Sequence, residues 1–417
     1  MQYTEMSKKD IRCKKTTPYL CGTRALGRGL CVNAINKCNN RTRRNRGVVR
    51  NTTSTSTSTS TSTSTSNDFG YNMKNIGRGC YPSRLRLDYE KTNKVYDTVP
   101  ESFSIMTYNI WGLSVTPNLK HLIDLRSKLL VKTILDQDAD MLCFQEMSEY
   151  MLDKLKLPII DKYKFASEPT YKFDNRRNRD VDTYFVSRYI PKRVRVYGLP
   201  GVLEYKNSMC VVEFPNLVIF NLYLQAGSKS SIGQETNWIH YSRCRFDLLN
   251  YVYDMIDKKY KNINIIICGD LNFHLDGAIS EWPEVLMLNK LKDAGFIDTF
   301  RQLNPSKSGF TEDTDLNMMR YNYKLMNKFY RFDGLFIKLA EENVPRFAPV
   351  KSKVFGQELK YLNVKESGWF YKNMSQAVRL GLDSSKLKGA KMLDRGYSLP
   401  INASDHFGVI THFKQIN

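Results

Sequence analysis

Short apolar runs divide residues 102–415 into segments typical of buried strands, and polar or glycine-rich turns separate them. The runs that predict strands lie at residues 103–112, 141–147, 181–190, 209–214, 217–224, 265–268, 330–339 and 404–413. Apolar positions recur at helical spacing in residues 125–140 and 240–256. Several predicted strands follow one another with only short turns between them. The pattern therefore predicts an α/β fold with mixed sheets rather than a regular βαβ repeat.

Residues 1–100 have a different composition from the rest of the chain. A Thr/Ser repeat, TTSTSTSTSTSTSTS, occupies residues 52–66 and cannot bury enough apolar surface to fold. Directly before it, residues 40–50 read NRTRRNRGVVR, a cluster typical of nucleic-acid binding or of a nuclear-import signal. We therefore expect a basic, mostly disordered N-terminal region at 1–100 and a folded domain at 101–417. A small ordered module around residues 11–38 is an open alternative.

The charge of the chain bears on its partners. Its 417 residues carry a formal net charge of +21, from 63 Lys and Arg against 42 Asp and Glu. Residues 1–100 contain 19 basic and 6 acidic residues, and residues 101–417 contain 44 and 36. Both parts are basic, which favours a polyanionic partner: nucleic acid (DNA or RNA) first and an anionic membrane surface second. A basic tail that only aids solubility is the simpler alternative.

The N-terminal sequence and the nine cysteines bear on the compartment. The chain opens with MQYTEMSKKDIRCKK, which is too polar for a secretion signal, and it contains no apolar run of 18 residues. We expect an intracellular protein, nuclear or cytoplasmic, that is not secreted, has no membrane span and is a monomer. Cys13, Cys21, Cys31 and Cys38 are spaced at intervals that match no common zinc site, so we expect free thiols there.

Four predicted strands end in polar side chains that are able to bind a cation or polarise water. These side chains are Asn109, Glu146, Asp270 with Asn272, and Asp405 with His406. Each has an ordinary explanation when taken singly, because Asp and Asn are frequent in turns and at helix N-caps. The alternation of an extended segment also places Asp270 and Asn272 on the same side. Four such ends in one domain favour a shared site over four unrelated turns.

The stretches that carry these residues occur in a fixed order between residues 102 and 415. They read TYNIWGL, DADMLCFQEM, NIIICGDLNFH, RFDGLFI and SDHFGV. In this order they resemble the endonuclease/exonuclease/phosphatase superfamily of metal-dependent phosphodiesterases. The resemblance implies a four-layer αββα sandwich with two mixed β-sheets and an active site where the sheets meet.

The resemblance also implies a metal site. It assigns Mg²⁺, with Mn²⁺ as an alternative, to Glu146, and Asn109 and Asp405 would complete or orient the metal shell. Hard cations prefer such oxygen ligands and usually keep several waters. Trp111 occupies a position where related branches usually carry an acid, so the resemblance leaves the metal shell open there.

Five residues around the phosphate receive roles from the same resemblance. Asp270 would orient or deprotonate the attacking water, and Asn272 would donate a hydrogen bond to a phosphoryl oxygen. His406 would contact the phosphate and would be held in place by a hydrogen bond with Asp333. Tyr223 stands where many members have His and is similar to the AP endonuclease branch, in which its phenol would donate to an anionic oxygen.

A further set of residues is expected to contact the substrate. The pattern T-x-D-T-x-x-N at 311–317, followed by the RFD strand, is similar to tyrosyl-DNA phosphodiesterases, and a predicted loop at 175–180 is rich in Arg. The candidates are Arg176, Arg177, Thr311, Asn317 and Arg331. Residues 340–403 exceed the length of a plain connection, so we expect a long insertion there. It is either a basic lid over the site or an insertion without catalytic consequence.

The leading hypothesis is a Mg²⁺-dependent phosphodiesterase that acts on nucleic acid, as an endonuclease, an exonuclease or a DNA-repair enzyme that processes DNA ends. A lipid or inositol-phosphate phosphodiesterase or phosphatase of the same superfamily is the second hypothesis. The third is a non-catalytic nucleic-acid-binding relative. The presence of Glu146, Asp270, Asn272 and His406 together disfavours the third.

Overall fold

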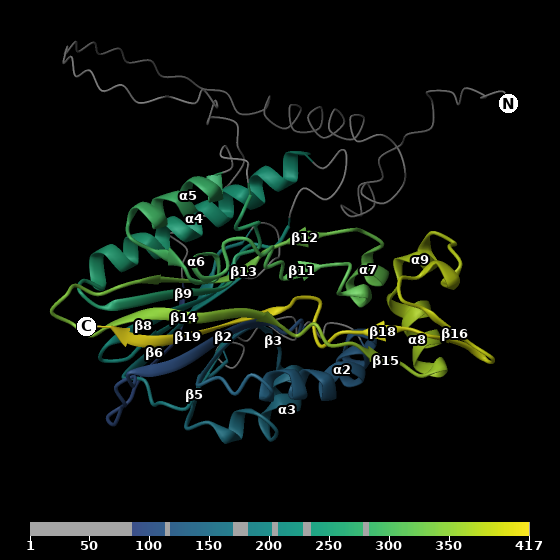
Figure 1. Cartoon of the computed structure of the whole chain (residues 1–417), viewed down its shortest axis with the longest axis horizontal. Helices are drawn as coiled ribbons and strands as arrows, with labels where there is room; N and C mark the ends of the chain where they lie inside the picture. The colour runs from purple at the N-terminus through teal and green to yellow at the C-terminus, as the bar shows by residue number, and fades with distance from the viewer. Residues whose placement is uncertain are drawn as a thin grey trace, which may run out of the picture. The chain divides into compact units, whose positions relative to one another are not determined.

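The computed structural model describes residues 86–112, 117–169, 182–201, 207–227, 235–277 and 283–416. The Thr/Ser repeat, the Arg-rich stretch and the N-terminal cysteines lie outside these ranges, so the expectations about them stay predictions. Figure 1 shows two extended sheets packed face to face, with helices against their outer surfaces. The predicted α/β sandwich with two mixed sheets is confirmed.

The larger sheet has seven strands in the order β1-β6-β7-β8-β9-β13-β10. Their bounds are β1 Arg86–Thr92, β6 Arg193–Leu199, β7 Asn207–Glu213, β8 Leu217–Tyr223, β9 Asn264–Asp270, β10 Ile297–Asp298 and β13 Asp333–Lys338. Only β8 and β9 are parallel to each other. Every residue of these two strands is buried. Burial on both faces explains why their sequences are nearly continuous apolar runs.

The smaller sheet has six strands in the order β14-β19-β2-β3-β5-β4. Their bounds are β2 Ser102–Asn109, β3 Met141–Met147, β4 Phe165–Ala166, β5 Asp182–Ser187, β14 Arg346–Phe355 and β19 Gly408–Ile416. Here β2 and β3 form the parallel pair. In both sheets the motif-bearing strands are inner ones. The polar residues lie at the carboxyl ends of β2, β3 and β9, and at or just before the amino ends of the antiparallel strands β13 and β19.

Three apolar layers hold the sandwich together. The flanking helices are α2 Pro117–Leu135, α3 Glu149–Lys156, α4 Glu235–Lys259 and α5 Pro283–Asp293. Cys143 and Ile219 belong to the core between the two sheets. Leu249 of α4 packs on the outer face of the larger sheet, and Met151 of α3 packs on the outer face of the smaller one. This arrangement is the αββα order that the sequence predicted.

Strand β1 lies before the expected start of the folded domain at residue 101. It pairs antiparallel with β6 at the edge of the larger sheet, so the expectation that order begins near residue 102 is wrong. The sequence of this strand, RLDYEKT, is as polar as the N-terminal region. An edge strand with an exposed side needs few apolar residues, and composition alone therefore assigns it to the tail.

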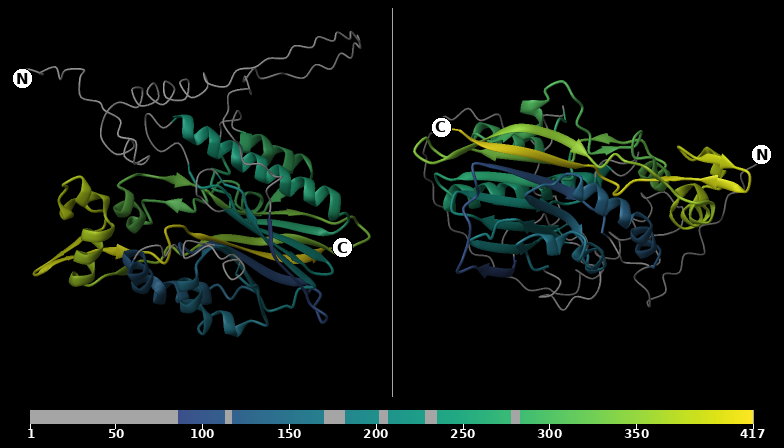
Figure 2. Two further views of the ribbon diagram at one scale, coloured as in Figure 1. Left: turned by 180° about the vertical axis from the view of Figure 1, so that it is seen from behind. Right: turned by 60° about the horizontal axis from the view of Figure 1, so that its bottom comes forward.

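The expected insertion at 340–403 is shorter than predicted, because β14 belongs to the smaller sheet. Within the expected insertion, residues 356–403 depart from the sandwich, and we call them, together with α7, the end module. Its elements are α7 Met318–Lys324, β15 Lys360–Tyr361, α8 Val364–Met374, α9 Gln376–Arg379, η6 Ser384–Lys386, β16 Lys391–Leu393, β17 Gly396–Ser398 and β18 Pro400–Ile401. Met319, Phe370 and Leu399 form a core of their own with Trp111 and Leu122. Figure 2 shows the module at one end of the sandwich.

Three short elements complete the path between β10 and β13. They are α6 Thr299–Leu303, β11 Glu312–Asp313 and β12 Phe329–Tyr330, and η4 Ile160–Lys162 follows α3. The strands β11 and β12 form a hairpin whose loop contains α7. None of the described helices is long and apolar enough to cross a membrane.

Candidate active site

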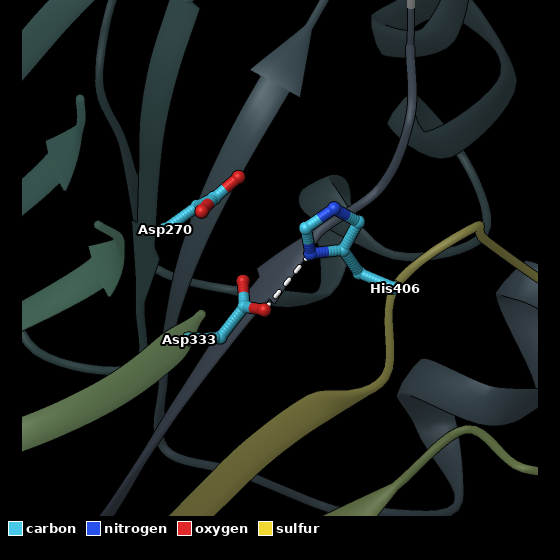
Figure 3. A group of neighbouring side chains, drawn as sticks. All are labelled: Asp270, Asp333 and His406. Atoms are coloured by element: carbon cyan, nitrogen blue, oxygen red, sulfur yellow. Dashed lines mark hydrogen bonds and ion pairs between the residues drawn. The ribbon is translucent and has the colours of Figure 1, made fainter. Parts of the chain in front are cut away.

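The polar ends of strands from both sheets meet at one edge of the sandwich. Asn109 ends β2 and Asp270 ends β9, and the amide of Asn109 donates to the Asp270 carboxylate over 2.9 Å. Asp333, the first residue of β13, lies directly opposite Asp270 in the antiparallel ladder. Figure 3 shows Asp270, Asp333 and His406 converging on one point. The structure thus brings together residues separated by about 300 positions, as the order of the motifs indicated.

His406 and Asp333 form a buried pair. His406 Nδ1 lies 2.9 Å from Asp333 Oδ2, and the two side chains are 8% and 0% exposed. Burial alone would lower the pKa of the imidazole, but the Asp333 and Asp270 carboxylates outweigh it and raise the pKa of His406 well above its usual value. The two carboxylates therefore favour the charged form of His406, and the contact with Asp333 uses Nδ1 and leaves Nε2 for another partner. The predicted contact between Asp333 and His406 is present.

Asp270 is fixed from three sides. Its Oδ1 accepts a hydrogen bond from the backbone N–H of Asn272 at 2.9 Å, and its Oδ2 accepts from Asn109 Nδ2 and Asn272 Nδ2 at 2.9 and 3.2 Å. Burial, and then the neighbouring Asp333 carboxylate, raise the pKa of Asp270 to about 8. A carboxylate that gains and loses its proton near neutral pH is suited to act as a general base.

The backbone before Asp270 requires glycine. Gly269 has φ +135°, and a Cβ at this position would lie 1.9 Å from the carbonyl oxygen of Leu222 on the neighbouring β8. Only a residue without a side chain fits this close approach. Gly269 therefore allows β9 to stay paired while its last residue turns into the site.

Glu146 sits where β3 departs from regular pairing. The register with β5 shifts between Phe144 and Met147, and Glu146 has φ 55° in the left-handed region. Its Oε1 accepts hydrogen bonds from Asn109 Nδ2 at 3.2 Å and from the Tyr223 hydroxyl at 2.9 Å. Burial and the nearby Asp405 carboxylate raise the pKa of Glu146.

The second oxygen of Glu146 supports a metal site. Glu146 Oε2 is buried, and no hydrogen-bond partner for it occurs among the described residues. A buried carboxylate oxygen without a donor is costly unless a cation satisfies it, and Mg²⁺ prefers such oxygens. Asp270, Asp333 and His406 form a second group whose ligand atoms lie within 4.8 Å of one another. The donor set therefore fits a divalent cation, with Glu146 Oε2 as a buried carboxylate oxygen that has no hydrogen-bond partner among the described residues.

Residues 106–320 match the model of the Endonuclease/Exonuclease/phosphatase family. The chain belongs to this family. Solved structures of similar fold include D. rerio TDP2 complexed with single strand DNA product, at 17% identity and a TM-score of 0.47, covering 76% of this chain and 100% of that chain. SmcL matches at 14% identity and a TM-score of 0.49, covering 76% of this chain and 100% of that chain. Beta toxin from Staphylococcus aureus matches at 16% identity and a TM-score of 0.44, covering 74% and 99%.

A comparison with curated protein sequences finds no match. Membership in the family makes the chain a hydrolase of phosphoester bonds, of a family whose members are typically metal-dependent. The substrate is not determined by membership. The residues around the site bear on which substrate the protein binds.

Arg331, which the RFD motif led us to expect at the substrate, has its guanidinium bound by carboxylates in the structure. Its guanidinium is 1% exposed and binds two carboxylates: Asp276 over 2.8 and 2.9 Å and Asp298 over 2.6 and 3.2 Å. These contacts use all three nitrogens of the guanidinium. Arg331 therefore links Asp276, in the loop after β9, to Asp298, at the start of α6.

Thr311 and Asn317 are fully buried, and their side chains make hydrogen bonds within the protein. The Thr311 hydroxyl accepts from the backbone N–H groups of Phe332 and Asp333 at 3.0 and 3.1 Å, which positions the residue that holds His406. Asn317 caps α7 and donates to the carbonyl oxygen of Ser404 at 2.9 Å. Arg176 and Arg177 lie outside the described residues, so the prediction for them stands untested.

Two predicted phosphate donors are engaged elsewhere. Asn272 directs its amide hydrogens to Leu224 O at 3.0 Å and to Asp270 Oδ2, so it orients Asp270 in this structure rather than facing a phosphate. Tyr223 likewise donates to Glu146 rather than standing free beside the site. Both residues are placed in the site as predicted, but their hydrogen bonds position the carboxylates.

Sequence reasoning missed a buried ion-pair chain next to His406. Arg320 Nε donates to Glu312 Oε1 at 2.7 Å, and its NH1 lies 3.3 Å from Asp405 Oδ2. Asp405, a predicted metal residue, is thus paired with Arg320, and it influences Glu146 through its charge. Lys328 adds a second cation 3.3 Å from Glu312. Arg320 lies three residues after the 311–317 pattern, and nothing in its spacing indicated its partners.

Proposed function

We propose that the chain is a Mg²⁺-dependent phosphodiesterase that cleaves nucleic acid. One observation carries the proposal: the His406–Asp333 pair, the Asp270 carboxylate held by Asn109 and Asn272, and a buried Glu146 oxygen without a partner among the described residues share one site. A phosphodiesterase needs these three functions, namely a cationic donor for the phosphoryl oxygens, a base for water and a carboxylate for a metal.

In this site Asp270 orients the attacking water and accepts its proton, while Asn109 and Asn272 keep the carboxylate in one orientation. The His406 Nε2–H donates to a non-bridging phosphoryl oxygen, and Asp333 holds the ring by its other nitrogen. The leaving oxygen departs on the side opposite the water. A divalent cation, held by Glu146 with Asn109 and Asp405 beside it, would neutralise the charge of the phosphoryl group.

Charge supports nucleic acid as the substrate. The net charge of +21 favours a polyanion, and the exposed Lys324 of α7 and Arg379 of α9 have no carboxylate partner among the described residues. Processing of an AP site or of an adduct at a DNA end is the finer form of the proposal. We place the protein in the cytoplasm or nucleus, where such substrates occur.

A lipid phosphodiester is the second candidate, and one feature of the end module favours it. The β16–β17 hairpin exposes Met392 and Leu393, at 68% and 50%, and Leu380 after α9 is 62% exposed. Exposed apolar side chains with lysines around them are suited to a membrane surface.

A substrate panel separates the two candidates. The full-length chain is incubated with Mg²⁺ and labelled single-stranded DNA, AP-site duplex, RNA, DNA with a 5′ phosphotyrosyl end, sphingomyelin vesicles or inositol phosphates. The proposal is supported if the chain cleaves a nucleic acid and the Asp270→Asn variant does not. The nucleic acid that is cleaved fastest then shows which branch of the family the activity resembles. Turnover of vesicles alone, lost in a Met392→Ser/Leu393→Ser variant, would establish the lipid candidate instead.

A further inference from the structure

The end module places a group of basic side chains beside the active site. We call Arg320, Lys324, Lys328 and Arg379 the basic cluster. Arg320 and Lys324 lie on α7, Lys328 follows α7, and Arg379 ends α9. Helices α7 and α9 pack against each other, and Figure 1 shows them side by side. The four side chains therefore come from two segments that lie outside the two main sheets.

Two members of the basic cluster are neutralised by carboxylates. Arg320 binds Glu312 and Asp405, and Lys328 binds Glu312, at distances of 2.7 to 3.3 Å. Their side chains are only 14% and 15% exposed. These two cations fix the position of α7 relative to Asp405, and they are not free to bind a ligand.

The other two members have no carboxylate to bind. Lys324 and Arg379 are exposed, and no ion pair involves either of them within the described part of the chain. Lys324 Nζ lies 4.6 Å from the ring centre of Tyr323. Burial of part of the side chain, and then the charge of Arg320, lower the pKa of Lys324. Two exposed cations without an ion-pair partner among the described residues, next to further positive charge, repel each other, and a bound anion would relieve this repulsion.

The basic cluster adjoins the candidate active site through Arg320. Arg320 contacts Asp405, the residue before His406. The Tyr323 ring packs edge-on against Trp111 at 5.2 Å, and Trp111 lies two residues after Asn109. The charge of Asp405 acts on both Tyr323 and Lys324. An anion bound at Lys324 and Arg379 would thus belong to the same substrate molecule as the phosphate at His406.

We propose that Lys324 and Arg379 bind the phosphate group next to the scissile one in a polynucleotide strand. This inference rests on the proposed function and deepens it, because it makes a substrate with at least two neighbouring phosphates the preferred one. A strand carries a phosphate at every nucleotide, so occupation of both positions is automatic. A phosphocholine lipid carries one phosphate and a cationic headgroup, which the basic cluster repels.

The test compares one-phosphate and many-phosphate substrates in the full-length chain. A Lys324→Gln/Arg379→Gln variant is assayed on single-stranded DNA and on bis(p-nitrophenyl) phosphate, a diester with one phosphate. We expect kcat/KM for DNA to fall roughly 10-fold, and its dependence on log salt to become shallower by about one unit per lost contact. Turnover of the one-phosphate diester should stay unchanged. The matched control, Lys365→Gln/Lys372→Gln, removes the same charge from exposed positions of α8.

Each result has a separate meaning. Equal losses in the variant and the control, or no loss in either, would overturn the inference and leave the proposed function intact. A loss on the one-phosphate diester as well would show that the two residues act on the site itself, which also overturns it. Loss of binding to phosphatidylserine vesicles with unchanged DNA cleavage would assign the basic cluster to a membrane. A wild-type chain that hydrolyses the diester but no nucleic acid would defeat the proposed function first.

Discussion

Two groups of buried charges lie next to each other in this protein, and they differ in how far the charges are matched. In the first, Arg331 binds Asp276 and Asp298 with all of its nitrogens. In the second, Asp270, Asp333 and Glu146 lie close together, and Glu146 Oε2 and Asp333 Oδ1 have no partner among the described residues. The first group is saturated. The second is incomplete without a cation and a substrate.

The two groups shift the pKa values of their carboxyls in opposite directions. Burial alone would raise the pKa of Asp276, but hydrogen bonds and charge from Arg331 and Arg301 lower it well below its usual range. Asp270 experiences burial and another carboxylate, and its pKa rises to about 8. The same residue type therefore serves as scaffold or as reactive group according to its partners, and perturbed carboxyls without a matching cation indicate the site.

The largest expected effect is on catalysis, in the unmatched group. Replacing Asp270 by Asn removes the base while keeping the shape and the hydrogen bonds from Asn109 in part. We expect kcat to fall about 1,000-fold or more, within the range known for general bases. Steady-state kinetics with Mg²⁺ on the preferred substrate measure it. Asp257→Asn, an exposed acid on α4, should leave kcat unchanged, and activity within tenfold of wild type in Asp270→Asn would contradict the assignment.

In the group of matched charges around Arg331, we expect a substitution to lower the free energy of unfolding and not the rate of catalysis. Arg331→Met leaves Asp298 without this cation and leaves Asp276 with Arg301 alone. Breaking a buried pair in this way typically costs about 3–5 kcal/mol. Urea unfolding at pH 7 measures the loss, with Arg395→Met in the β16–β17 turn as a control. A stable Arg331→Met protein with lower substrate affinity would restore the substrate-binding role.

The ion pairs of Glu312 predict that the free energy of unfolding depends on pH. Burial would raise the pKa of Glu312, but Arg320 and Lys328 outweigh it and lower the pKa to about 2 from a usual 4.5. A lowered pKa in the folded state means stability that is present above pH 4.5 and lost as pH falls towards 2. Glu312→Gln should therefore cost roughly 3 kcal/mol at pH 7. The difference from wild type should shrink below pH 4.5, and a cost independent of pH would refute the pairing.

The smallest of these effects concerns the metal. Glu146→Gln keeps the size of the side chain but removes the charge of the unpartnered oxygen. We expect the Mg²⁺ concentration for half-maximal activity to rise at least about 10-fold, since even outer partners of metal ligands contribute that much. Activity measured against a Mg²⁺ titration tests it, with exposed Glu149→Gln as the matched control. An unchanged requirement in Glu146→Gln would place the ion elsewhere.

The sequence predicted the sandwich and the meeting of Asn109, Glu146, Asp270 and His406. The reason is that central strands buried on both faces are nearly continuous apolar runs, and their ends mark one edge of a sheet. The contact of Asp333 with His406 came from the family resemblance, and the structure contains it.

Partners distant in sequence could not be predicted. Arg331 was expected at the substrate because the RFD motif gives no sign that Asp276 and Asp298, 55 and 33 residues earlier, would enclose its guanidinium. The hydrogen bonds of Tyr223 and Asn272 also depend on which acceptor lies nearest, which only packing decides. Strand β1 was missed because an exposed edge strand has the composition of a polar tail.

Hydrolysis of bis(p-nitrophenyl) phosphate by the EDTA-treated full-length chain, as Mg²⁺ is added back, tests the central claim most directly. The substrate needs no particular nucleic-acid or lipid contact, so it tests the reactive group alone. We predict no turnover without the ion, a saturable rise with Mg²⁺ or Mn²⁺, and a flat response in Asp270→Asn. Turnover that persists in EDTA, or that Asp270→Asn retains, would contradict the claim that the unmatched carboxylates are a metal-dependent phosphodiesterase site.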